Sequence, residues 1–308
     1  MAMNLLGKRY LFFGLSLLII VPGLLILLIG GLPLSLDFTG GSLLEIRMES
    51  GTNPQPAEVI ALYSDLGIKD TQVQTTDTGH IVIRSSFLDD PTREKILAEM
   101  STRFGGKVIT DRFDSVGPAI GAQVASRAAL AVAVAALVVV LYITWTFRGI
   151  AHAVRYGVCA ILAMIHDVAI VISVAGIGAL VLGWEMDALF LTALLTVIGF
   201  SVQDKIVVFD RIRENANILR RLDFETLVNH SIIQTLQRSI NTQLMTVEFL
   251  LMALALFGGV TLQEFAVILL VGLFSGTYSS IFIAAPILVV WEKKEWKTWF
   301  GRGEKAAA

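Results

Sequence analysis

Six long apolar runs limit what this chain can fold into more than any other feature of the sequence. They lie at residues 10–32, 124–147, 154–182, 188–209, 236–257 and 265–291. A helix needs about 20 mostly apolar residues to cross the hydrocarbon core of a bilayer, and every run reaches that length. The sequence therefore predicts a multi-pass α-helical membrane protein with six transmembrane helices.

The composition excludes several other classes of protein. Of the 308 residues, 55% are hydrophobic and only 16% are charged, whereas soluble domains carry about a quarter charged residues. Intrinsic disorder requires low hydrophobicity, so it is excluded as well. A net charge of -2 leaves no basic surface of the kind that nucleic acid needs. A single cysteine, Cys159, excludes an internal disulfide framework and a thiolate metal cluster.

The basic residues between the runs predict the orientation in the membrane. With six spans, all basic loops fall on one side, and the two short loops on the other side, 183–187 and 258–264, contain no Lys or Arg. The basic positions are Lys8, Arg9, Arg148, Arg155, Arg211, Arg213, Arg220, Arg221, Lys293, Lys294, Lys297, Arg302 and Lys305. Because positive charge stays on the cytoplasmic side, both termini are expected in the cytoplasm.

Residues 34–123 are then expected outside the membrane as a small α+β domain. Residues 42–48, 71–75, 80–85 and 107–113 have the pattern of strands. Residues 56–66 and 90–103 have helical spacing, each with a proline near its start. The order βαββαβ predicts a ferredoxin-like sandwich, a fold that by itself does not define a function.

These elements divide the chain into four expected parts. Residues 10–32 form the first transmembrane helix, which is too long for a signal peptide and is expected to stay as an uncleaved anchor. The extracytoplasmic domain covers 34–123. A five-helix transmembrane bundle covers 124–291 and includes a cytoplasmic amphipathic segment near 211–232. A basic cytoplasmic tail, 292–308, ends the chain.

Ionisable side chains within the apolar runs are the candidates for function, because charge inside a bilayer is costly. Asp167, Asp204, Arg238 and Glu248 occupy such positions. From the outer loops, Asp204 lies about 30 Å and Arg238 about 35 Å inward, so the two share a depth on consecutive helices. An arginine beside a carboxylate keeps the carboxylate ionised, and its displacement lets the carboxylate take up a proton.

Polar neighbours surround these two positions. Ser201 and Gln203 precede Asp204, and Asn241 and Thr242 follow Arg238. Together they predict a hydrated seam between two helices, with an interfacial arginine and a structural ion pair as the alternatives. Lys205 is a poor partner for Asp204, and His166 and Asp167 are expected to face apart, because adjacent residues do not share a helix face.

Glycines and small residues supply the remaining signals. Gly40-Gly41, beside the first helix, predicts a turn or hinge. Two ladders of small residues at four-residue spacing predict close helix packing, either within the bundle or against a partner. The ladders are Gly121, Ala125, Ala129 and Ala133, and Gly272, Gly276 and Ser280. No nucleotide-binding, metalloprotease or Cys/His metal motif is present, so neither an enzyme activity, a metal nor another cofactor is predicted.

An ordered set of short motifs along nearly the whole chain resembles the SecD–SecF family of protein-export membrane proteins, relatives of the RND transporters, and in particular its smaller, SecF-type half. The motifs are Asp37-Phe38-Thr39-Gly40-Gly41, residues 113–118, Ile165-His166-Asp167-Val168, Gly199-Phe200-Ser201-Val202-Gln203-Asp204, residues 207–215, residues 237–242 and residues 276–282.

The resemblance implies a subunit of the cytoplasmic (inner) membrane that works with SecD, with the SecYEG channel and with a translocating preprotein. YajC is a possible further partner. It implies that the proton gradient drives outward movement of the polypeptide, with Asp204 as the proton-path acid and Arg238 as its arginine. A second acid and the large polypeptide-gripping domain belong to SecD. The sequence departs from the family pattern at Gln203, Lys205 and Glu248.

Three functions follow as expectations. In the first, the chain transduces the proton gradient through Asp204 and Arg238. In the second, it is a structural partner that stabilises SecD and the channel. In the third, it is a component of RND-type small-molecule efflux. A buried carboxylate suits Na⁺ as well as H⁺, so the coupling ion stays open.

Overall fold

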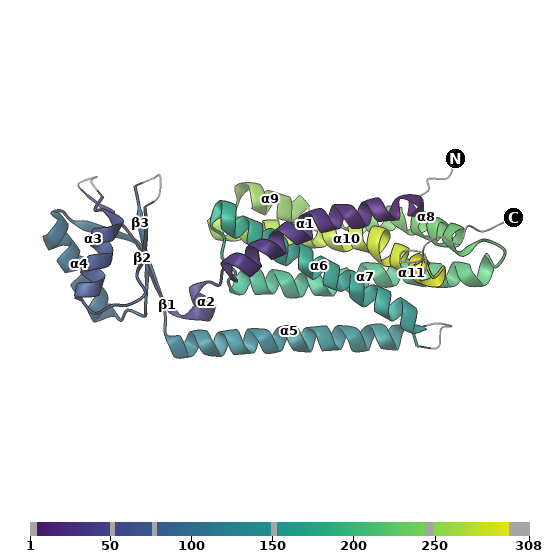
Figure 1. Cartoon of the computed structure of the whole chain (residues 1–308), viewed down its shortest axis with the longest axis horizontal. Helices are drawn as coiled ribbons and strands as arrows, with labels where there is room; N and C mark the ends of the chain where they lie inside the picture. The colour runs from purple at the N-terminus through teal and green to yellow at the C-terminus, as the bar shows by residue number, and fades with distance from the viewer. Residues whose placement is uncertain (1–4, 50–52, 76–78, 149–152, 244–248, 296–308) are drawn as a thin grey trace, which may run out of the picture. The chain divides into compact units, whose positions relative to one another are not determined.

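The computed structural model describes residues 5–49, 53–75, 79–148, 153–243 and 249–295. The chain divides into two compact units. The α+β unit is Leu34–Leu130, and the helical unit consists of Met1–Pro33 and Ala131–Ala308. Figure 1 labels most of their helices and strands.

The α+β unit contains a four-stranded antiparallel sheet. After the short helix α2 (Leu36–Thr39), the elements are β1 (Gly41–Met48), α3 (Pro56–Asp65), β2 (Gln72–Thr75), β3 (Ile81–Ser85), α4 (Asp90–Phe104) and β4 (Val108–Val116). The strand order in the sheet is β2-β3-β1-β4, and every neighbouring pair is antiparallel. The order of strands and helices, and their bounds to within three residues, match those expected from the sequence.

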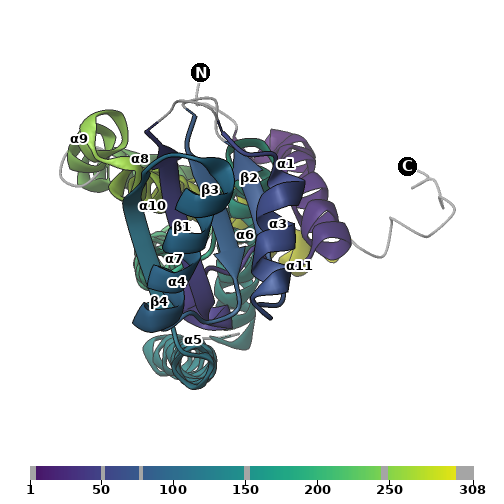
Figure 2. The same ribbon diagram turned by 90° about the vertical axis from the view of Figure 1, so that its left-hand side faces the viewer.

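One face of this sheet carries the core of the unit. Alternate residues of β1 and β3, such as Leu44, Ile46 and Ile83, are buried against the apolar sides of the two helices. Figure 2 shows α3 and α4 covering that face of the sheet. Asp89 begins α4 by accepting a hydrogen bond from the Thr92 backbone N–H at 3.1 Å, which satisfies a free donor of the first turn.

The Gly40-Gly41 pair joins α2 to β1 in a backbone conformation that favours glycine. Their φ angles are +69° and +117°. A Cβ atom on Gly41 would lie 2.8 Å from the backbone oxygen of Ser85, and one on Gly40 would lie 3.0 Å from Cα of Pro118. Both φ angles therefore favour glycine, and an added Cβ would clash at Gly41 and would be tightly packed at Gly40. The hinge role stays a prediction.

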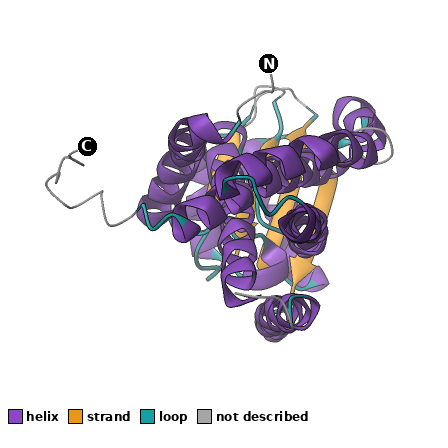
Figure 3. Ribbon diagram, turned by 90° about the vertical axis from the view of Figure 1, so that its right-hand side faces the viewer, coloured by secondary structure: helices purple, strands orange, loops and turns teal. Residues whose placement is uncertain are grey.

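Over the described residues, the chain contains five helices that are long and apolar enough to cross a membrane; four lie in the helical unit, and the helix Pro118–Thr146 begins in the α+β unit and continues into the helical unit. These are Leu6–Gly30, Pro118–Thr146, Ala153–Leu182, Ala188–Ile218 and Leu262–Glu292. They comprise η1 (Leu6–Lys8) with α1 (Arg9–Gly30), then α5 (Pro118–Thr146), α6 (Ala153–Leu182), α7 (Ala188–Ile218), and last α10 (Val260–Ser279) with η3 (Ser280–Ala284) and α11 (Ala285–Glu292). Figure 3 shows that helix dominates this unit.

The predicted span at 236–257 is not among these five. That stretch falls on the end of α8 (Phe224–Gln243), on residues 244–248, which lie outside the described residues, and on α9 (Phe249–Phe257). α8 carries polar residues on most of its turns, so it does not form an apolar window by itself. In addition, α7 continues to Ile218, so the segment expected near 211–232 is divided between the end of α7 and the start of α8.

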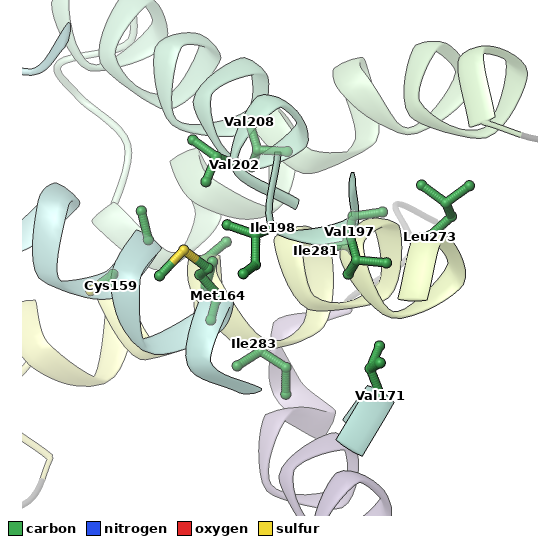
Figure 4. Close-up of a cluster of buried hydrophobic side chains, with 14 of the residues drawn as sticks. Cys159, Met164, Val171, Val197, Ile198, Val202, Val208, Leu273, Ile281 and Ile283 are labelled. Atoms are coloured by element: carbon green, nitrogen blue, oxygen red, sulfur yellow. The ribbon is translucent and has the colours of Figure 1, made fainter. Parts of the chain in front are cut away.

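Glycines let these helices approach one another closely. A Cβ atom on Gly272 of α10 would lie 2.1 Å from the side chain of Val197 in α7, and one on Gly23 of α1 would lie 2.3 Å from Ser173 of α6. The ladder of small residues in α10 thus packs within the bundle, as close approach in lipid requires. Figure 4 shows part of the resulting core, where Met164, Val197 and Leu273 come from three different helices.

A π-helical segment, η3, separates α10 from α11. Pro286 follows it in the first turn of α11. A proline inside a continuous α-helix removes one backbone hydrogen bond and clashes with the preceding turn, and a π-helical turn is one way to accommodate it. The segment sits directly after Ser275–Ser279, which carries most of the polar side chains of α10.

A cluster of ion pairs joins three distant parts of the helical unit at one end. Arg9 contacts Glu225 at 3.0 Å and Glu295 at 2.5 Å, and Lys293 contacts Glu225 at 2.6 Å and Asp223 at 3.2 Å. The first residue of α1, the start of α8 and the end of α11 are thereby held together. The hydrogen bond from Lys293, and then the charge of Arg9, lower the pKa of Glu225 from its ordinary value of 4.5.

The first prediction concerns Gly41. Gly41→Ala is expected to destabilise the α+β unit by more than the ~1–2 kcal/mol that a positive φ costs an alanine, because the added Cβ also meets Ser85. Gly67→Ala is the matched control, since Gly67 has a φ of +78° with nothing within 4 Å of the added Cβ. Thermal unfolding of the purified protein compares the two. Equal losses would show that strain alone acts at Gly41.

The second prediction concerns pH. Because the folded pKa of Glu225 is below its unfolded value, the stabilisation is complete above pH 4.5 and is lost as the pH falls through the lower folded pKa. The Tm of the wild type should therefore exceed that of Glu225→Gln near neutral pH and converge with it in acid. Glu214→Gln, which removes one exposed carboxylate paired with Arg211, serves as the control. A pH-independent difference would contradict the assignment.

Candidate functional site

The centre of the helical unit contains a fully buried ion pair. Asp167 of α6 and Lys205 of α7 both have side chains with 0% exposure, and Lys205 Nζ lies 2.7 Å from Asp167 Oδ2. Charges removed from water are costly unless they are paired and hydrogen-bonded. The surroundings of this pair supply the additional bonds.

Three serine hydroxyls and one imidazole complete the shell of Asp167. Ser201 Oγ and Ser279 Oγ each donate to Oδ2 at 2.7 Å, and Ser275 Oγ donates to Oδ1 at 2.7 Å. His166 Nδ1 lies 3.1 Å from Oδ1. Five groups from three helices therefore hold one carboxylate, which is more than the four positions that its lone pairs offer in ideal geometry.

The ammonium of Lys205 is also surrounded by hydrogen-bond partners. Besides Asp167, its ammonium donates to the backbone oxygen of Ser201 at 2.9 Å and contacts Ser201 Oγ at 2.7 Å. Residues four apart lie on the same helix face, so the ammonium reaches back over the preceding turn of α7. Ser201 Oγ accepts from Lys205 and donates to Asp167, which links the two charges a second time.

Asp204 lies beside this centre but contacts a different part of α10. Its side chain is 7% exposed, and Oδ2 accepts a hydrogen bond from Thr277 Oγ1 at 3.0 Å. Since Ser275 and Ser279 bind Asp167, alternate residues of one short stretch of α10 contact the two buried carboxylates.

The other residues proposed from the sequence are dispersed. Arg238, Asn241 and Thr242 of α8 are exposed, and so is Gln203 of α7. The structure buries Asp204 and leaves Arg238 on an exposed face, so the seam between them stays a prediction. Glu248 lies outside the described residues.

Two expectations about neighbouring residues turn out differently. Lys205, expected to be a poor partner for Asp204, forms its ion pair with Asp167 of α6. The expectation that His166 and Asp167 face apart is wrong, because the imidazole of His166 bends toward the carboxylate of the next residue. His166 also stacks on Tyr278, with ring centroids 6.2 Å apart, which fixes the orientation of its ring.

Sequence reasoning missed the contribution of α10. Ser275, Thr277 and Ser279 supply hydroxyls to both carboxylates. The available signal was the recurrence of hydroxyl residues at positions 275 and 279 of an otherwise apolar span, which places them on one face. Among the described residues, no group of three His, Cys, Asp or Glu side chains could hold a metal ion.

A helical membrane protein with a small α+β unit after its first span, and with two buried carboxylates among its spanning helices, is the class that this fold and site define. Residues 96–294 match the family described as "Protein export membrane protein SecD/SecF, C-terminal", and residues 25–52 match the "SecD/SecF GG Motif". The second match includes Gly40 and Gly41. The chain belongs to the SecD/SecF family.

Individual relatives support this assignment. The chain is 67% identical over 306 residues to the protein translocase subunit SecF of Anaerolinea thermophila, and the match covers 99% of both chains. It is 45% identical to the SecF subunit of Thermobaculum terrenum, with 97% of both chains covered. It is also 36% identical to the protein translocase subunit SecDF of Thermus thermophilus, covering 86% of this chain and 35% of that one.

A solved structure has a similar fold. The crystal structure of SecDF, described as a translocon-associated membrane protein, from Thermus thermophilus has a TM-score of 0.76 and 32% identity. The match covers 95% of this chain and 39% of the SecDF chain. The chain thus corresponds to a little over a third of that longer protein.

The third prediction tests the shell of Asp167. Ser279→Ala should destabilise the helical unit by about 1.5–3 kcal/mol, because it removes a hydrogen bond to a charged, buried group. Ser280→Ala is the matched control: Ser280 is equally buried, but its hydroxyl donates to a backbone oxygen of its own helix, Thr277 O, at 2.8 Å. Thermal unfolding in detergent measures both. Losses of equal size would mean that the bond to Asp167 has no special weight.

Proposed function

We propose that this chain is the SecF half of a SecD–SecF unit that supports preprotein export through the SecYEG channel, with YajC as a further possible partner. It spans the cytoplasmic membrane six times, with both termini in the cytoplasm and a ferredoxin-like domain outside. The βαββαβ order and the β2-β3-β1-β4 sheet support the ferredoxin-like assignment. Relatives named SecDF, in which matching residues form part of a longer chain, support SecD as the partner.

Within this unit, the chain couples the proton gradient to outward movement of the polypeptide, and Asp204 carries the proton. The observation that carries this proposal is the position of Asp204, a buried carboxylate that contacts the same short stretch of α10 as Asp167. Asp167 is bound by an ammonium and three hydroxyls, which suits a structural ion pair. Asp204 accepts a hydrogen bond from Thr277 of that stretch, so a change in its protonation would act directly on α10.

The exposed face of α8 completes the proposal. Arg238, Asn241 and Thr242 would face lipid if the chain were alone in the membrane, and an arginine there is costly. If a partner subunit such as SecD binds this face, it provides polar contacts for these three side chains. Movement of this face relative to α7 would then bring Arg238 toward Asp204 or away from it, which changes whether the carboxylate holds a proton.

The fourth prediction is that Asp204→Asn abolishes the stimulation of export by a proton gradient without loss of the complex. Asp210→Asn, on the same helix but exposed and paired with Arg213, should leave stimulation unchanged. The assay follows preprotein translocation into membrane vesicles that carry each variant with its SecD, with and without an imposed gradient. Co-purification of SecD checks assembly.

A second candidate function, a scaffold that stabilises SecD and the channel, is favoured by the complete pairing of Asp167 and Lys205, which suits a structural ion pair. In that case, export by the Asp204→Asn variant is expected to respond to the proton gradient as export by the wild type does. Gly276→Leu, which would press against Ser201 of α7, instead releases SecD. Small-molecule efflux receives no support from any described feature of the structure.

A further inference from the structure

The ammonium of Lys205 lies in a cradle made of oxygen atoms. Its three contacts are Asp167 Oδ2 at 2.7 Å, Ser201 Oγ at 2.7 Å and the backbone oxygen of Ser201 at 2.9 Å. The whole side chain has 0% exposure, so water does not complete this shell from outside. The ammonium is therefore surrounded by protein oxygen atoms, as a bound metal cation would be.

The chemistry of these contacts is that of a cation site rather than of an ion pair alone. A carboxylate, a hydroxyl and a backbone carbonyl are the oxygen ligands that hard cations take in proteins. The ammonium has three N–H donors, and the carboxylate, the hydroxyl and the helix carbonyl at 2.9 Å supply one oxygen each. Ser201 supplies two of the three oxygens, so one residue of α7 forms two thirds of the cradle.

The cradle keeps its shape independently of the lysine. Ser275 and Ser279 of α10 and His166 of α6 all hold Asp167 by bonds that do not involve Lys205. Removal of the ammonium would leave the three oxygens in place around a cavity, with one uncompensated negative charge. A buried charge of this kind strongly favours a replacement cation.

We propose that the space around Lys205 Nζ is a monovalent-cation site that the chain fills with its own ammonium. A single carboxylate provides one negative charge, so a monovalent ion such as Na⁺ balances it, whereas a divalent ion would leave a buried positive charge. The tethered ammonium makes the contact of α6, α7 and α10 independent of the free ion concentration. This inference goes beyond the proposed function and holds whether or not Asp204 carries protons.

The fifth prediction is that Lys205→Ala converts the tethered site into one for free cations. The Tm of the full-length variant in detergent should rise with the logarithm of the Na⁺ concentration, as mass action requires for an ion that binds only the folded state. Choline replaces Na⁺ at constant ionic strength to remove screening effects. The wild type should show no such shift, because its site is already occupied.

Two further variants make the test decisive. The double variant Asp167→Asn, Lys205→Ala lacks the charge and should lose the response to Na⁺. Lys205→Ser provides a second opening of the site with an added hydroxyl, in case the alanine variant does not fold without the ion. A Tm that is independent of Na⁺ in both single variants, an equal response in the wild type, or failure of both to fold even in high Na⁺ would each overturn the proposal.

Discussion

The buried ion pair between Asp167 and Lys205 is the interaction on which the rest of the helical unit depends. Neither charge could remain in the apolar interior alone, because desolvation would cost more than any single contact returns. The pair is tolerated because hydroxyls of Ser201, Ser275 and Ser279 use the remaining capacity of the carboxylate. This arrangement links α6, α7 and α10 at one point, and so it fixes their rotation about their own axes. Apolar packing alone would leave that rotation poorly defined.

Close packing of the helices is the condition for this polar centre. The hydroxyls of α10 contact Asp167 in a bundle whose helices lie close together, and Gly272 leaves no room for a Cβ beside Val197 of α7. The π-helical turn that follows sets the position of Ser279 relative to α11 while Pro286 starts the next helical segment. The same short stretch contacts Asp204 through Thr277. One short segment of α10 therefore contacts both carboxylates.

Much of the fold could be predicted from periodicity. The strands of the α+β unit follow the alternation of residues such as Leu44 and Ile46, and the predicted bounds of its strands and helices lie within three residues of those in the structure. Five of the predicted spans appear as continuous helices. The stretch 236–257 is not among them, because residues 244–248 lie outside the described residues and α8 is polar on most of its turns. The candidate site was predicted less completely: Asp167 and Asp204 were identified, but Lys205 was not recognised as the partner of Asp167.

The sequence by itself determined that this chain spans a membrane, where the α+β unit begins, and which ionisable residues are forced into the apolar spans. Those properties are local: they depend on hydropathy, strand alternation and caps within a few turns. Only the tertiary structure decided which charges meet. Lys205 and Asp167 are 38 residues apart, and Ser279 lies 112 residues from Asp167. Whether they meet depends on helix rotation and on glycine-permitted spacing, which no short window of sequence encodes. The same holds for the exposed position of Arg238, since a helix face is identified as covered or free only after the other helices are in place.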